Sequence, residues 1–331
     1  MVDRVSPSPW TASVLLVALC TTGLVAQRTS SREPPAQAVR SVPKTSWGHP
    51  DLQGIWDQTT GTPLERPDEY KGRTLLTEVE AAERERLRFA EFDEDGRAGG
   101  TGDYGSVWRE QSKNALNRTA LITELEDGRI PPLTPAGRRD LETRTTARRA
   151  RGEADSWHDR SLWERCITRG LPESMLPGPY NSNLQILQTA DYVVLLTEMI
   201  HDARIVPLDG RPHPRGVTQW MGVSRGRWED TTLIVETTNF SAQSNYRGAA
   251  AGLHLVERFR RLDADTLDYR VTVTDPTTWK SPWTMTLPMV KSQGLVYEYA
   301  CHEGNYGLRN MLTVARAADG DAGTGAAPKN D

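Results

Sequence analysis

Hydrophobic and polar positions alternate with a period of two through most of the second half of the chain. In residues 267–274, for example, Tyr269, Val271 and Val273 fall on one side and polar residues on the other. This period places successive side chains on opposite faces of a β-strand. Similar short runs predict strands at residues 184–189, 192–197, 203–208, 232–237, 255–261, 267–274, 283–287 and 295–300. Strands at this spacing are typical of an antiparallel β-barrel or sandwich, which we assign to residues 180–316.

The first half of the chain has helical and turn signals instead. Thr77 followed by Glu80 is a capping box, and the run after it favours a helix to about Phe92. Thr134 and Pro135 begin a second helix that extends to about Arg149. Residues 117–123 form a short strand candidate. The fold class is therefore α+β and mainly β, with residues 47–179 as an extended and helical wrap on the β-domain.

Three terminal or linking segments lack this patterning. Residues 1–26 have a positive charge at Arg4 and then an apolar run, which is typical of a secretory signal peptide. An uncleaved anchor and a lipoprotein signal at Cys20 are alternatives, although the run is short for a membrane span. Residues 27–46 are expected to be a disordered linker, and residues 317–331 a disordered tail. The protein is therefore predicted to be periplasmic or secreted.

Two cysteines, Cys166 and Cys301, follow the leader. In an exported chain a pair of cysteines favours a disulfide. Two buried free thiols, or a nucleophile, are the alternatives.

Composition narrows the classes of function. The 331 residues are 25% charged and 37% hydrophobic, which excludes a polytopic membrane protein and an intrinsically disordered chain. Forty basic and 44 acidic residues leave a net charge of −4, so nothing attracts the whole chain to nucleic acid. Residues 138–165 contain eight Arg, but six acidic residues lie among them, which favours a solvated helix face. We expect neither a nucleic-acid partner nor a stable membrane span after cleavage of the leader.

Short motifs are spread over most of the chain. They lie at residues 50–56 (Pro-Asp-Leu-Gln-Gly-Ile-Trp), 127–135, 208–214, 224–229, 254–259, 275–276, 282–283 and 298–303. In these motifs the chain resembles a family of exported bacterial β-rich proteins, known mostly as hypothetical proteins, which are plentiful in acidobacteria and some proteobacteria. The resemblance implies export and a β-rich fold, and it implies no activity. Family members usually have Gly-Asp where this chain has Asp230 and Thr231, so the hairpin turn there is expected to differ.

Candidate chemistry is concentrated in two polar clusters at the ends of predicted strands, residues 201–204 and 301–305. No G-x-S-x-G, H-E-x-x-H, P-loop or C-x-x-C motif is present, and Ser224 is not expected to be a nucleophile. Imidazole takes and gives protons near neutral pH, and a carboxylate orients it or acts as the base. The predicted catalytic residues are the proton carriers His201 and His302, the carboxylates Asp202 and Glu303, and Arg204 for an anionic group.

Aromatic residues of the β-domain are candidates for a ligand-binding wall. The predicted binding residues are Asn305, Trp220, Trp228, Trp279, Trp283 and Tyr299. The structural alternative is that most of these Trp side chains close the ends of the barrel as core. His213, between two prolines, is interpreted as a loop-packing residue.

These residues predict an exported β-barrel enzyme with acid–base chemistry of hydrolase, lyase or isomerase type on a small organic substrate of aromatic or polycyclic character. The alternative is a periplasmic carrier that binds an apolar or aromatic small molecule without converting it, as a lipocalin does. An envelope protein with a structural role is a third hypothesis. No cofactor is predicted. The same side chains can bind Zn²⁺ or another divalent metal, but their spacing does not select one.

Overall fold

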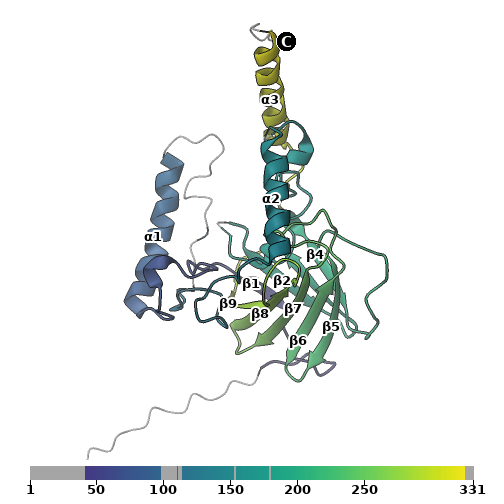
Figure 1. Cartoon of the computed structure of the whole chain (residues 1–331). Coiled ribbons are helices and arrows are strands. Elements are labelled where there is room, and N and C mark those ends of the chain that lie inside the picture. The colour runs from purple at the N-terminus through teal and green to yellow at the C-terminus, as the bar shows by residue number, and fades with distance from the viewer. Residues whose placement is uncertain (1–41, 98–109, 111–113, 153, 179, 325–331) are drawn as a thin grey trace, which may run out of the picture. The chain divides into compact units, whose positions relative to one another are not determined.

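The computed structural model describes residues 42–97, 110, 114–152, 154–178 and 180–324 (Figure 1). The predicted signal peptide, most of the predicted linker and residues 325–331 lie outside these ranges. In the described residues the strands form one antiparallel sheet with the order β4-β3-β2-β1-β9-β8-β7-β6-β5. The strands are β1 (Gly54–Asp57), β2 (Asn183–Gln188), β3 (Tyr192–Thr197), β4 (Ala203–Pro207), β5 (Val223–Glu229), β6 (Thr232–Thr238), β7 (His254–Arg261), β8 (Thr266–Thr274) and β9 (Trp283–Lys291).

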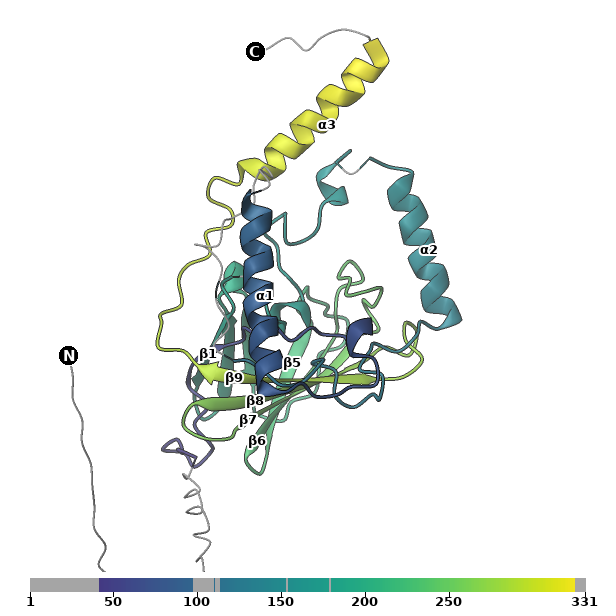
Figure 2. The ribbon, with the colours of Figure 1, turned by 90° about the vertical axis from the view of Figure 1, so that its left-hand side faces the viewer.

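The sheet curls into a nearly closed barrel, as the sequence predicted (Figures 1 and 2). Its two end strands, β4 and β5, meet at Gly226. A Cβ atom at this glycine would lie 2.6 Å from Leu208 and 2.8 Å from Val206, so no larger residue fits between the strands without movement. Every second residue of β8 is buried, including Tyr269, Val271 and Val273, which confirms the predicted alternation. The inward faces of the strands form one apolar core.

The segment before β1 packs at one end of the barrel. The side-chain amide of Gln188 accepts a hydrogen bond from the backbone N–H of Leu52 and donates one to the carbonyl of Pro50. Arg261 donates to the carbonyl of Asp51 at 2.6 Å, and its guanidinium lies 5.5 Å from the centre of the Trp56 ring. The motif at residues 50–56 therefore has a structural role: it ties the N-terminal segment to β2 and β7.

Within the described ranges, three α-helices accompany the sheet: α1 (Glu78–Arg97), α2 (Pro135–Arg149) and α3 (Tyr306–Thr324). Both predicted helix starts are confirmed. At α1 the Glu80 carboxylate accepts from the Thr77 N–H, and the Thr77 hydroxyl accepts from the Glu80 N–H. The neighbouring Arg73 lowers the pKa of Glu80 to about 2, with the Thr77 hydrogen bonds contributing. At α2 the Thr134 hydroxyl accepts from the N–H of Gly137 at 3.0 Å.

The structure corrects four predictions. Residues 295–300 are not a strand, because they leave the sheet with their apolar side chains Leu295 and Tyr297 exposed and bury no face against the core. Residues 117–123 form isolated bridges only. Residues 54–57 of the predicted extended and helical wrap are strand β1, which belongs to the sheet because it pairs with both β2 and β9. Residues 317–324, expected to be a disordered tail, continue helix α3, whose first turn is capped by the Asn305 side chain accepting from the N–H of Leu308.

The β5–β6 hairpin turns at Asp230 and supports a stability prediction. Glu229 pairs with Thr232, and Asp230 between them has a φ of 52°, a conformation that favours glycine. We expect Asp230→Gly to raise the free energy of unfolding by about 0.5–1 kcal/mol. Urea denaturation measures the change. Thr231→Gly is the matched control, because Thr231 lacks a positive φ, and it should destabilise the protein. Equal effects of the two variants would contradict the explanation.

Candidate functional site

The first predicted cluster is divided between the surface and the barrel interior. His201 is exposed in the short 3-10 helix Met199–His201, between β3 and β4. Asp202 is half-buried and accepts a hydrogen bond of 2.7 Å from the hydroxyl of Thr168. Burial raises the pKa of the Asp202 carboxyl, against the lowering effect of this hydrogen bond. Asp202 therefore anchors the segment around Thr168 to the start of β4.

Arg204 does not reach a surface where an anionic substrate can bind. It points into the barrel, where its two terminal nitrogens donate to the Glu257 carboxylate at 2.6 and 2.9 Å. The Tyr269 hydroxyl donates to the same carboxylate at 3.0 Å. All three side chains are buried. The structure therefore makes Arg204 part of a charged network in the core, which the sequence did not predict.

The second predicted cluster is held by the disulfide Cys166–Cys301, which confirms the predicted pairing. The side-chain amide of Asn305 donates to the carbonyl of Glu164 at 3.2 Å, while His302 and Glu303 are exposed. Tyr299, Glu303 and Asn305 line a surface recess of about 750 Å³ beside the disulfide. Three of the predicted residues thus share one recess, without either predicted histidine among its lining residues.

The two predicted clusters lie at the same end of the barrel but do not touch. Each is bonded to the segment 164–169, the first through Thr168 and the second through Cys166. Over the described part of the chain, no hydrogen bond or ion pair joins His201 or Asp202 to His302 or Glu303. The paired acid–base geometry expected from the sequence is not formed by these residues.

The predicted Trp residues have different environments. Trp279 and Trp283 are buried and pack edge to face, with ring centres 6.0 Å apart. Tyr246 adds a third ring, 6.2 Å from Trp283. Trp228 is half-buried and stacks on His49 with ring centres 4.8 Å apart, and Trp220 is half-buried as well. The core interpretation therefore fits Trp279 and Trp283 best.

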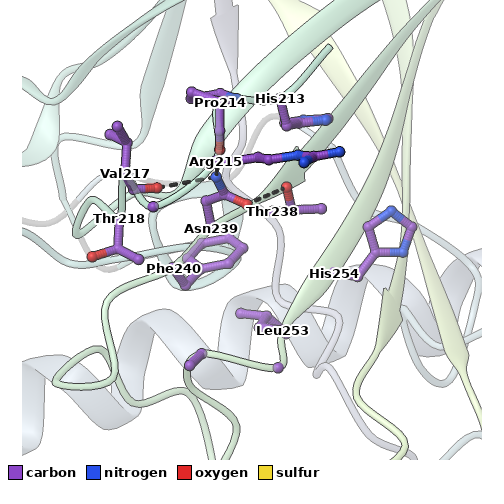
Figure 3. Close-up of a pocket in the computed structure, with 13 residues that line it drawn as sticks. His213, Pro214, Arg215, Val217, Thr218, Thr238, Asn239, Phe240, Leu253 and His254 are labelled. Carbon is purple, nitrogen blue, oxygen red and sulfur yellow. Dashed lines mark hydrogen bonds between the residues drawn. The ribbon is translucent and has the colours of Figure 1, made fainter.

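A different group of titratable side chains surrounds a pocket of about 620 Å³, shown in Figure 3. We name it the loop pocket. Its walls are residues 213–218 of the β4–β5 connection, residues 238–240 after β6, and residues 251–254 at the start of β7. Phe240 and Leu253, both buried, give it an apolar floor. Its volume lies in the range that holds a small organic molecule.

His254 and Glu236 form a carboxylate–imidazole pair at the edge of the loop pocket. Glu236 on β6 pairs directly with Val256 on β7, so Glu236 and His254 share the outer face of the sheet. Nε2 of His254 lies 2.8 Å from Oε1 of Glu236. Because an ionised carboxylate only accepts, Nε2 carries the hydrogen, and Nδ1 of the neutral imidazole keeps its lone pair. The pair therefore presents a basic nitrogen with a fixed tautomer.

The wall that carries His213 is held in place by its neighbours. Nε2 of His213 donates to the backbone carbonyl of Glu236 at 3.2 Å. The side-chain amide of Asn239 donates to the carbonyls of Pro214 and Val217 at 2.7 and 3.0 Å (Figure 3). These bonds fix the residues on both sides of Arg215. The interpretation of His213 as a loop-packing residue is consistent with its contact, although its ring also lines the pocket.

Arg215 brings a positive charge to the loop pocket. Its side chain is exposed, and in Figure 3 it extends across the pocket with its guanidinium below the His213 ring, on the side where His254 lies. Within the described residues, the guanidinium has no hydrogen bond or ion pair. It is therefore free to bind a group from outside the protein.

Sequence reasoning missed this site because its members are far apart in the chain. The sequence-based prediction used histidines and acids that are adjacent in the chain. His254 and Glu236 are 18 residues apart and lie on different strands. The usable signal was that Glu236 is a polar position of one predicted strand and that His254 directly precedes another. Only the pairing of β6 with β7 brings them together.

Two further properties concern the described part of the chain alone. It contains no group of three or more His, Cys, Asp or Glu residues arranged to hold a metal ion. None of its helices is long and apolar enough to cross a membrane.

Comparison of the chain with protein-family models, with curated proteins and with solved structures finds no match.

Proposed function

We propose that this protein is an exported β-barrel enzyme that performs acid–base chemistry on a small organic substrate in the loop pocket. The observation that carries the proposal is the 2.8 Å contact between His254 and Glu236 at the pocket edge. It moves the hypothesis of a histidine–carboxylate enzyme from residues 201–204 and 301–305 to strands β6 and β7.

In this proposal Nδ1 of His254 removes a proton from the substrate. The Glu236 carboxylate stabilises the imidazolium that forms, since it accepts the hydrogen on Nε2 in both protonation states. The imidazolium then returns the proton to the leaving group or to another atom of the substrate. A positioned histidine of this kind accelerates a reaction by about 10²–10⁴-fold.

Export is part of the proposal and has independent support. The disulfide Cys166–Cys301 is of the kind that persists in oxidising compartments. The predicted signal peptide at residues 1–26 and the family resemblance agree with a periplasmic or secreted protein.

A screen in D₂O tests the chemistry across several substrate classes at once. The purified protein is incubated with a panel of small carboxylic acids, phosphate monoesters, esters and amides, and proton NMR records C–H exchange, elimination and hydrolysis. We expect turnover of at least one compound, lowered about 10²–10⁴-fold by His254→Gln and less by Glu236→Gln. His201→Gln and His302→Gln are the matched controls, expected to leave the rate unchanged.

Two outcomes would overturn the enzyme proposal. One is turnover that His254→Gln leaves intact. The other is binding of panel compounds without conversion by the unsubstituted protein, which would identify a carrier. If His201→Gln and His302→Gln lose activity and His254→Gln does not, the active site lies at residues 201–204 and 301–305, as the sequence predicts.

A further inference from the structure

We infer that the substrate of the loop pocket carries an oxyanion, a carboxylate or a phosphate, which binds to Arg215, and an apolar part that lies on Phe240 and Leu253. This inference rests on the proposed function, because it names the substrate class of the same pocket. The three residues come from the three walls of the pocket, so a single small molecule can contact all of them.

Arg215 differs from the arginines on the neighbouring segments. Arg211 is ion-paired with Asp209, and Arg227 with Glu229. Arg225 donates to the backbone carbonyls of Pro212 and Ser224. Among the described residues Arg215 alone of these four has no such acceptor. A guanidinium is a planar fork of donors that fits an oxyanion through two parallel hydrogen bonds. The missing acceptor is therefore best supplied by a ligand.

The backbone that presents Arg215 is already ordered. Pro214 precedes it with a restricted φ, and Gly216 follows it with a φ of 72°, which a glycine adopts without strain. The carbonyls of Pro214 and Val217 are both held by the Asn239 side chain. Binding at a loop fixed in this way loses less conformational entropy than binding at a free loop.

Among the described residues that line the pocket, none carries a carboxylate, and the two carboxylates beside these residues are held by hydrogen bonds. The Glu236 carboxylate is engaged by His254. Asp275, buried beside Gly252, has both oxygens bonded, one to the backbone and hydroxyl of Thr277 and the other to the hydroxyl of Thr278. Among the described residues that line the pocket, the permanently charged side chain is that of Arg215.

Binding measurements test the inference with three probes of similar size: benzoate, phenyl phosphate and the neutral benzyl alcohol. Titrations are followed by isothermal calorimetry with the full-length mature protein. We expect benzoate or phenyl phosphate to bind, and Arg215→Gln to weaken that binding about 10- to 100-fold. Arg227→Gln is the matched control, since Arg227 is an exposed arginine on β5 that already has a partner, and it should change affinity by less than about twofold.

Several outcomes would overturn the inference. They are an anion affinity that Arg215→Gln leaves unchanged, equal binding of benzyl alcohol and benzoate, or the absence of binding by both anions. Preference between benzoate and phenyl phosphate distinguishes the two oxyanions.

The same variants separate this inference from the proposed function. His254→Gln is expected to lower turnover about 10²–10⁴-fold and to keep benzoate binding. Anion binding that depends on Arg215, without any turnover, supports the inference and contradicts the enzyme. Turnover of a neutral substrate that survives in Arg215→Gln supports the enzyme and contradicts the inference.

Discussion

Replacing Glu257 with Leu is expected to lower the free energy of unfolding by about 3–5 kcal/mol. Glu257 is fully buried in the barrel and accepts two hydrogen bonds from Arg204 and one from the Tyr269 hydroxyl. Without the carboxylate, the guanidinium is left charged inside the core, and the hydroxyl loses its acceptor. An unpaired buried charge is the more expensive of these two losses.

Urea denaturation of Glu257→Leu, followed by circular dichroism, measures this loss. The double variant Arg204→Met/Glu257→Leu is the control, because it removes both charges together and replaces them by apolar side chains. We expect it to regain most of the stability that the single variant loses. If the free energy of unfolding of Glu257→Leu lies within about 1 kcal/mol of that of the unsubstituted protein, the pair contributes little beyond an ordinary hydrogen bond.

The second large effect is expected from removing the disulfide. Cys166→Ser/Cys301→Ser should lower the free energy of unfolding by up to about 4–5 kcal/mol, since the bond closes a loop across a sequence separation of 135 residues. The bond also attaches the chain after β9, which is outside the sheet, to the segment 164–169. We therefore expect limited proteolysis to cut the double variant between residues 292 and 305, ahead of cuts elsewhere.

Reduction provides the matching control for this prediction. Dithiothreitol should destabilise the unsubstituted protein to the level of the serine variant and leave the serine variant unchanged. If the two proteins unfold at the same urea concentration without reductant, the bond adds no stability. Benzoate binding at the loop pocket should persist in the serine variant, because the pocket takes its walls from other segments.

The loop pocket shows where sequence reasoning reached its limit. It predicted histidine and carboxylate chemistry, and placed that chemistry where the residues are adjacent in the chain. Arg204 was assigned to an anion, and the fold places it against Glu257, 53 residues away. Arg215, which has no acceptor among the described residues, directly follows the motif at residues 208–214 and is not part of it.

Local interactions account for what the sequence determined by itself. The alternation in residues 267–274, the Thr77–Glu80 capping box and the Thr134–Pro135 helix start depend on neighbours within one turn or one strand. Each is confirmed by the structure. The pairing of Cys166 with Cys301 was also predicted, because two cysteines after the leader allow only one intrachain bond.

Only the tertiary structure decided which faces and strands come together. The sequence pattern places Glu236 in one predicted strand and His254 just before another, but their contact requires that β6 pairs with β7 in one particular register. Residues 295–300 have the pattern of a strand, yet they lie outside the sheet with Leu295 and Tyr297 exposed. Such pairings depend on residues far apart in the chain, whose contacts form only when the whole barrel closes. A local sequence pattern therefore cannot predict which strands pair or in which register.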